Sequence, residues 1–133
     1  MNKHAVVRKA SIAEVVAALP VKGKSMFPPF HVFEGQKPPF HILEDTMVSN
    51  SPEIHTTEGD LWLCLEGEVQ FTCGGEMLDQ KEVGPNEMVG SRIENGETMT
   101  LTEGDWLWIP PHVPHQHAAQ GTARLLIIKI PAD

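Results

Sequence analysis

The chain has 133 residues, 41% of them hydrophobic, and a formal net charge of −8. This length suits a single domain over residues 1–133 with one hydrophobic core. The negative charge argues against nucleic acid and anionic membrane surfaces as partners, because both attract basic patches. Neutral or cationic small molecules remain open as ligands.

The two cysteines, Cys64 and Cys73, form no disulfide framework. Cys64 lies within an apolar run, so we expect a buried, reduced thiol. A reducing cytoplasm fits this use of cysteine best. No apolar run approaches the length of a membrane span, and residues 5–19 lack the long apolar region of a signal peptide.

A short helix is predicted near the N-terminus, over residues 11–19. Ser11 and Glu14 have the spacing of a capping box, in which each side chain accepts a hydrogen bond from the backbone of the other. Apolar residues continue the helix to Leu19, and Pro20 follows its end. After Pro20 the pattern changes from helix to strand.

Short apolar runs separated by glycine and proline predict strands over the rest of the chain. The clearest runs are 61–65, 69–72, 106–109 and 125–130. Residues 106–109 and 125–128 are apolar at every position. We therefore expect both faces of these strands to be covered, as in a β-sandwich or a small barrel.

Two proline-rich segments, 28–34 and 38–44, have similar sequences, PPFHVFE and PPFHILE. Proline cannot donate a hydrogen bond to a central ladder, so we expect two extended segments at sheet edges. These segments are candidate contacts with a neighbouring subunit. Further along, Asn95-Gly96 predicts the turn of a hairpin between residues 91–94 and 97–102.

Two carboxylates, an imidazole and an indole are predicted to converge near residues 53–62. If 53–56 is a strand and the chain reverses through 56–59, His55 lies opposite Asp60 and Glu53 lies opposite Trp62. Cross-strand partners share a face, as do residues two apart on one strand. Carboxylates so close together repel unless a cation or a proton lies between them.

This first cluster therefore indicates a metal, or one carboxylate with a raised pKa. The alternative is that the acidic residues are ordinary solvated charges of a turn. Trp62 fits a core position as well as it fits a platform for a substrate.

A second cluster follows residues 104–109. Three prolines shape a tight connection there, and His112, His115 and His117 lie within six positions. His115 and His117 begin the next strand on one face, because they are two residues apart. A turn stiffened by proline fixes an imidazole at a low ordering cost, so at least one of these histidines is a candidate metal ligand.

The two segments resemble the two motifs of the cupin family. The first has the spacing Glu53-x-His55-x4-Asp60-x6-Gly67, against G-x5-H-x-H-x3,4-E-x6-G in the family. The second has the spacing Gly104-x5-Pro110-x-His112-x2-His115, against G-x5-P-x-G-x2-H-x3-N. The resemblance implies an all-β double-stranded β-helix, the cupin or jelly-roll barrel, with one short N-terminal helix. The core barrel would span residues 51–130, with the site inside it.

The resemblance also implies a ligand set, which is Glu53, His55, Asp60 and His115. Glu53 stands where the family has histidine, Asp60 where it has glutamate, His112 where it has glycine and Ala119 where it often has asparagine. Two imidazoles with one or two carboxylates suit a divalent transition metal, Fe(II), Mn(II), Ni(II) or Zn(II). If only one carboxylate binds, the set has open positions and suits activation of O₂ by Fe(II).

The implied function is that of a metal-binding cupin acting on a small organic molecule, as a dioxygenase, an isomerase or a lyase. Glu53 or Asp60, whichever stays off the metal, would be the catalytic group that moves a proton. Trp62, His112 and His117 would line the substrate pocket. The alternative is a non-catalytic cupin that binds a sugar or another small molecule. Because barrels of this kind often pair, we expect a homodimer.

Residues 74–103 form a longer spacer between the motifs than many cupins have. The spacer is either a tolerated surface extension, or a rim over the barrel mouth or a dimer partner. We favour the rim or dimer interpretation, because Met77, Met88 and Met99 would supply adaptable apolar surface.

Overall fold

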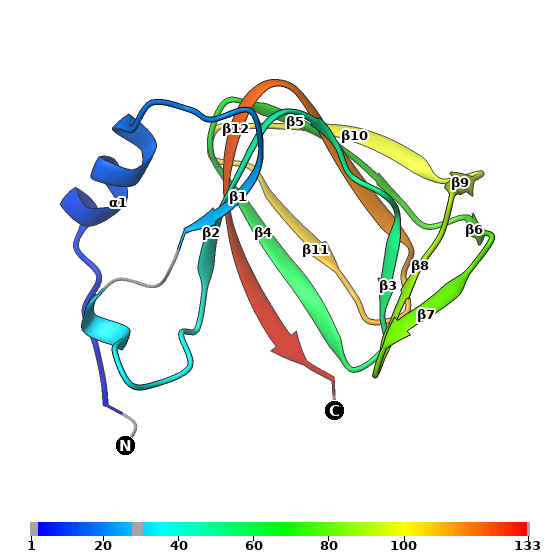
Figure 1. The fold of residues 1–133 in the computed structure, drawn as a ribbon, viewed down its shortest axis with the longest axis horizontal. Helices are drawn as coiled ribbons and strands as arrows, with labels where there is room; N and C mark the ends of the chain where they lie inside the picture. Colours follow the sequence, from blue (N-terminus) through cyan, green and yellow to red (C-terminus); the bar gives the residue numbers. More distant parts are fainter. Residues whose placement is uncertain (1–2, 28–30, 133) are drawn as a thin grey trace.

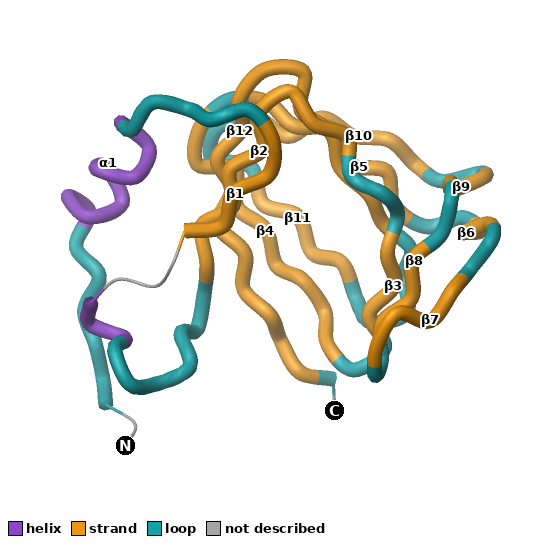
Figure 2. The backbone as a smooth tube through the Cα atoms, in the orientation of Figure 1, coloured by secondary structure: helices purple, strands orange, loops and turns teal. Residues whose placement is uncertain are grey.

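The computed structural model describes residues 3–27 and 31–132. In this part of the chain, one short helix precedes a barrel of antiparallel strands (Figures 1 and 2). Within the described ranges, no helix has the length and hydrophobicity that a membrane span needs. The elements are α1 (Lys9–Ala17), β1 (Gly23–Phe27), the 3-10 helix η1 (His31–Phe33), β2 (His41–Ser49), β3 (Glu53–His55), β4 (Glu58–Glu66), β5 (Glu68–Cys73), β6 (Glu76–Leu78), β7 (Lys81–Gly84), β8 (Glu87–Val89), β9 (Arg92–Glu94), β10 (Glu97–Thr102), β11 (Trp106–Ile109) and β12 (His115–Pro131).

Ten strands form one continuous sheet that folds over on itself, and β12 belongs to both of its faces. On one face the order is β1-β2-β12-β4-β11, and on the other it is β7-β8-β3-β12-β5-β10. β6 and β9 pair separately as a small second sheet. This is a jelly-roll barrel with one short helix, so the predicted fold class is confirmed. The sheet also includes β1 and β2, which precede the range 51–130 expected for the core barrel.

Strand β12, with 17 residues, rises on one face of the barrel and descends on the other (Figure 1). Its first residues pair with β3 and β5, and its last residues pair with β4. Its register against β2 shifts between Ala119 and Thr122, where the strand bends over. Both ends of β12 therefore lie at the same end of the barrel, although they are far apart in the sequence.

The hydrophobic core lies between the two faces. Cys64 is fully buried in it, as expected, and burial raises the pKa of its thiol. The core consists of Leu43, Trp62, Cys64, Val69, Phe71, Leu101, Ile109, Ala119, Ala123, Leu125 and Ile127. The four core residues of β12 are all at odd-numbered positions, so the odd positions of this strand face the interior.

Helix α1 begins and ends two residues earlier than predicted, at Lys9 and Ala17. The predicted capping box is wrong, because the N-cap is Arg8 and its side chain makes no cap hydrogen bond. The backbone N–H of Ser11 already donates to the carbonyl of Arg8 at 3.0 Å. Ser11 is therefore inside the first turn rather than in front of it.

No residue of the helix is fully buried, and polar contacts link the end of the helix to the barrel. The guanidinium of Arg124, on β12, donates to the carbonyls of Val16 and Ala18 near the end of the helix. Arg124 also pairs with the buried carboxylate of Glu44 on the neighbouring β2, at 2.9 Å. A cation at the carbonyl end of a helix is favourable, and here it links the helix to the sheet.

The predicted Asn95-Gly96 hairpin is also wrong. The flanking strands do not pair with each other: β9 pairs with β6, and β10 pairs with β5. Gly75 lies opposite, between β5 and β6, and a Cβ there would come within 2.2 Å of the Glu94 carbonyl oxygen. The Asn-Gly pair therefore lies at a kink between β9 and β10, opposite the connection between β5 and β6, and not at the tip of a hairpin.

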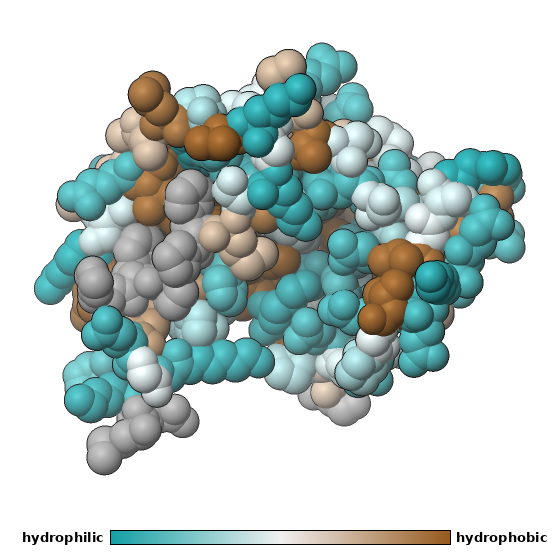
Figure 3. Space-filling model, viewed as in Figure 1, coloured by the Kyte–Doolittle hydropathy of each residue, from teal (hydrophilic) through white to brown (hydrophobic). Residues whose placement is uncertain are grey.

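The outer face of β11 differs from the expectation that both of its faces are covered. Trp106 and Trp108 are 57% and 47% exposed, because β11 is the edge strand of its face. Leu125–Ile127, in the centre of the same face, are at most 9% exposed, as expected, but Ile128 is partly exposed. The view in Figure 3 is mostly hydrophilic, with apolar side chains gathered in separate patches, one of them over the β7–β8 region.

In the described residues, neither proline-rich segment is the extended segment at a sheet edge that was predicted. Residues 28–30 lie outside the described residues, and His31–Phe33 form the 3-10 helix η1. β2, which contains most of the second segment, lies between β1 and β12. Pro38 and Pro39 precede β2, so they remove no hydrogen bond from its ladder.

The corner between β4 and β5 depends on Gly67. Its φ is +81°, and a Cβ there would lie 2.1 Å from the carbonyl oxygen of Thr122, where β12 bends over. We expect Gly67→Ala to lower the free energy of unfolding by more than about 2 kcal/mol, because it adds this clash to the cost of a left-handed backbone. Urea denaturation measures the change.

Two matched variants separate the cost of the steric clash from the cost of the left-handed backbone. Gly74→Ala, at φ +80° in open space, is expected to show the backbone cost alone. Gly121→Ala, where a Cβ meets nothing within 4 Å, is expected to be nearly neutral. Equal effects at positions 67 and 121 would contradict this account of the corner.

Candidate metal centre

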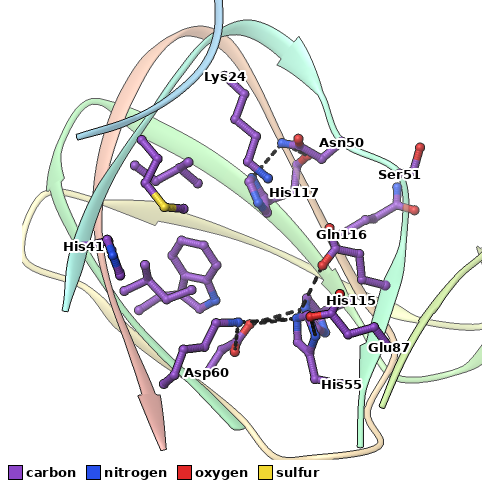
Figure 4. A pocket seen from close by; sticks show the side chains of 16 residues that line it. Lys24, His41, Asn50, Ser51, His55, Asp60, Glu87, His115, Gln116 and His117 are labelled. Atoms are coloured by element: carbon purple, nitrogen blue, oxygen red, sulfur yellow. Dashed lines mark hydrogen bonds and ion pairs between the residues drawn. The ribbon is translucent and has the colours of Figure 1, made fainter. Parts of the chain in front are cut away.

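A cavity of about 290 Å³ lies inside the barrel, with polar groups at both of its ends (Figure 4). Apolar side chains of Met26, Leu43, Trp62 and Ile127 form part of its wall. Sites for small molecules usually have volumes of about 300–1,000 Å³. The cavity is at the small end of this range, so it suits a ligand of few atoms.

The first predicted cluster converges in this cavity, but not through the predicted hairpin. β3 pairs with β8 and β12, whereas β4 pairs with β11 and β12, so His55 does not lie opposite Asp60 in a ladder. The chain crosses from one face of the barrel to the other between His55 and Glu58. Glu53, His55, Asp60 and Trp62 all line the cavity because their strands face each other across the interior.

Three of the predicted ligands bring their donor atoms together. One atom each from Glu53, His55 and His115 lie within 4.8 Å of one another. Glu53 and His115 are register partners on β3 and β12, and His55 is two residues from Glu53, on the same side of β3. His55 and His115 are 7% and 4% exposed, so the two imidazoles are held in place by their surroundings.

Both imidazoles direct Nε2 toward the carboxylates. The Nε2 atom of His55 lies 3.3 Å from Glu53 Oε2, and that of His115 lies 3.4 Å from Asp60 Oδ2. The Nδ1 atom of His115 lies 3.0 Å from the carbonyl oxygen of Val113. This contact fits a tautomer with the proton on Nδ1, which leaves the Nε2 lone pair free for a metal.

Asp60 has a partner that the sequence analysis missed. Lys129 is the register partner of Asp60 on β12, and its Nζ donates to Asp60 Oδ1 at 2.6 Å. The same Nζ lies 3.4 Å from Nε2 of His55. Lys129 interrupts an apolar run at an odd-numbered, interior position of β12, and this interruption is the signal that could have identified it.

His115 and Lys129 together favour the ionised form of Asp60. Burial raises the pKa of this carboxyl, but the nearby imidazole of His115 and the hydrogen bond and charge of Lys129 outweigh it and hold the pKa below its usual value. Oδ2 of Asp60 is buried and has no hydrogen-bond partner in the described part of the chain, although Nε2 of His55 and of His115 lie 3.6 and 3.4 Å from it. An ionised, buried carboxylate with one free oxygen is consistent with a second cation close by.

Only some of the remaining predicted pocket residues lie at the cavity. Trp62 and His117 line the cavity, but His112 is exposed and does not, which corrects the expectation for His112. Its φ is +70°, and its backbone N–H donates to the His55 carbonyl at 2.8 Å. The position therefore contributes its backbone, and a left-handed φ explains why the family favours glycine there.

The spacer supplies part of the wall of the site. β8 pairs with β3, and Oε1 of Glu87 lies 3.4 Å from the buried Nδ1 of His55. Carboxylates in this position commonly orient the histidine ligands of metals. Met77 is buried, at 2% exposure, so it does not supply the adaptable surface that we expected, whereas Met88 and Met99 are partly exposed.

No family model and no curated protein matches the sequence. Solved structures resemble it at low sequence identity. The cupin domain of Drosophila melanogaster CENP-C has a TM-score of 0.52 and 14% identity, over 71% of this chain and 62% of that one. A predicted oxalate decarboxylase from Thermotoga maritima has a TM-score of 0.51 and 17% identity, over 70% and 65% of the two chains. An oxalate oxidase has a TM-score of 0.50 and 15% identity, over 69% and 41%.

The chain thus spans less than two thirds of the length of each of these proteins. At such identities the likeness concerns the fold and not the activity. The strand order, the position of the cavity and these structural neighbours agree, and the chain has the cupin fold.

Proposed function

We propose that this chain is a metal-dependent cupin enzyme in which Glu53, His55 and His115 bind Fe(II), and that it oxidises a small organic molecule with O₂. The observation that carries the proposal is the convergence of these three donor atoms within 4.8 Å in a cavity of about 290 Å³. Two histidines and one carboxylate with open positions are characteristic of non-haem Fe(II) oxygenases.

The structure supports one carboxylate ligand rather than two. Lys129 occupies Oδ1 of Asp60 at 2.6 Å, which leaves Glu53 as the carboxylate without a lysine partner in the cluster. One carboxylate does not neutralise a divalent ion, so a bound metal keeps the positive charge that makes it a Lewis acid. The lowered pKa of Asp60 makes it a weak base.

Asp60 therefore acts in this proposal by holding Lys129. The ammonium group of Lys129 has N–H bonds to spare beyond the one to Asp60. Nζ of Lys129 lies 3.4 Å from Nε2 of His55. It is therefore placed to donate a hydrogen bond to an oxygen of a molecule bound at the triad, which is the set of proposed ligands Glu53, His55 and His115. The bound metal would supply the affinity for oxygen ligands, and Lys129 would orient them.

A second candidate function is a binding cupin that works without metal. The observation in its favour is also Lys129, because an ammonium group between Asp60 and His55 provides positive charge where an ion would otherwise do so. In that case the cavity binds its ligand through Lys129 and the imidazoles, with no turnover.

Metal content separates the two candidates. Protein loaded anaerobically with Fe(II) is expected to hold about one ion per chain. The variants His55→Ala and His115→Ala are each expected to weaken Fe(II) binding more than about 100-fold, because each removes a ligand. His4→Ala, at an exposed histidine, is the matched control and keeps the ion. Nitric oxide, a surrogate for O₂, should bind the loaded protein and give an electron paramagnetic resonance signal.

Lack of any metal after supplementation with iron, manganese, nickel and zinc in turn would exclude the enzyme and favour the binding cupin. Metal that persists in both histidine variants would contradict the assigned ligands.

The roles of the carboxylates and the lysine are tested by measuring metal affinity. Glu53→Gln is expected to weaken Zn(II) or Fe(II) binding more than Asp60→Asn does, because only Glu53 is a ligand in the proposal. Lys129→Met is expected to strengthen it at least tenfold, since it removes a cation near the ion and frees Asp60. Lys22→Met, at an exposed lysine, should leave it unchanged. Weaker binding in Lys129→Met would contradict the assignment.

A further inference from the structure

The cavity has a second polar end, formed by residues that the metal centre does not use. Asp45 on β2 is fully buried, and His117 on β12 is 7% exposed. Oδ2 of Asp45 lies 2.6 Å from Nδ1 of His117, and the side-chain N–H of Asn50 donates to the same oxygen at 3.1 Å. Figure 4 shows His117 and Asn50 at the end of the cavity away from Asp60, His55 and His115.

The imidazole of His117 is fixed in orientation. Its ring packs against Trp62 and Phe71, with centroid distances of 5.3 and 5.0 Å. Nδ1 lies 3.0 Å from the amide nitrogen of Asn50 and 2.6 Å from Oδ2 of Asp45. The shorter contact, with a carboxylate that can only accept, places the proton on Nδ1, and in this tautomer Nε2 is an acceptor. Among the described residues, Nε2 has no hydrogen-bond partner, and His117 lines the cavity. An oriented acceptor in a cavity suits a hydroxyl group of a ligand.

Lys24 adds a positive charge to this end. It is the register partner of Asp45, so the two side chains lie on the same face of their strands. Lys24 also lines the cavity, and Figure 4 shows its side chain extending toward His117. No salt bridge involves Lys24 in the part of the chain that the structure describes. An ammonium group at the cavity mouth suits a carboxylate.

We propose that His117 and Lys24 form a subsite for a hydroxycarboxylate group, with the ligand hydroxyl donating to His117 Nε2 and its carboxylate bound by Lys24. Asp45 is a positioning residue, which holds the imidazole in one tautomer. The net charge of −8 led us to expect neutral or cationic ligands. The charge of Lys24 is positive, so at this end of the cavity we propose an anionic group instead.

The spacing of the two ends limits the ligand. His115 and His117 are two residues apart on one strand, so their Cα atoms are about 7 Å apart. A ligand that reaches both ends carries metal-binding oxygen atoms at one end and the hydroxycarboxylate at the other, with a short apolar segment between them beside Trp62 and Ile127.

Three probes of similar size test the subsite: lactate, which has both groups, propionate, which lacks the hydroxyl, and propane-1,2-diol, which lacks the carboxylate. Nuclear magnetic resonance titration of metal-free protein is expected to show at least tenfold tighter binding of one lactate enantiomer than of either other probe. The ¹⁵N resonance of His117 Nε2 should shift with lactate, and this readout needs no variant.

Two variants assign the contacts. Lys24→Met is expected to weaken lactate and propionate binding alike, at least fivefold, while Lys22→Met leaves both unchanged. His117→Phe is expected to remove the preference for lactate over propionate. Equal affinity for all three probes, no binding of lactate, or an unchanged preference in His117→Phe would overturn the proposal. Because the protein is free of metal, these outcomes are independent of whether the triad binds an ion.

Discussion

The structure depends on one long strand that serves both faces of the barrel. β12 begins beside β3 and β5, bends over between Ala119 and Thr122, and ends beside β4. Strand geometry places every second side chain inside, so His115, His117 and Lys129 reach the same cavity. Shifting β12 by one residue would turn all three outward and move the core residues between them to the surface.

This constraint explains why the site is built on strands rather than on a flexible loop. The start of β12 pairs with β3, which carries Glu53 and His55. The end of β12 pairs with β4, which carries Asp60. The contact between Lys129 and Asp60, at 2.6 Å, joins β12 to β4 at this end of the barrel. A centre supported by paired strands on both sides is held in its geometry before a ligand arrives, which favours binding and catalysis.

The charged groups of the cavity are divided between its two ends. At the triad end, two carboxylates and a lysine surround two imidazoles. At the other end, Asp45 and Lys24 flank a third imidazole. Apolar side chains of Leu43, Trp62 and Ile127 line the same cavity. A ligand with polar groups at both ends and an apolar middle fits this distribution.

Strand periodicity, a local property, predicted a β-sandwich or a small barrel. The jelly-roll barrel itself was implied by the resemblance of the two motifs to the cupin family. The convergence of Glu53 and His55 with Asp60 was also predicted, but for a wrong reason. The spacing of these residues fits a hairpin, in which two strands pair in one ladder. It fits equally well two strands that face each other across a barrel. Asn95-Gly96 misled for a similar reason, as a kink uses the same residues as a turn. Lys129 was missed because its partner is contributed by a strand distant in sequence.

The central claim is that Glu53, His55 and His115 hold one metal ion. Anomalous X-ray scattering from a crystal of the metal-loaded protein tests it most directly. The account predicts one peak within about 2.3 Å of a Glu53 oxygen and of Nε2 of both histidines, with Lys129 still bound to Asp60. A peak elsewhere in the molecule, or the lysine ammonium in place of a peak, would contradict it.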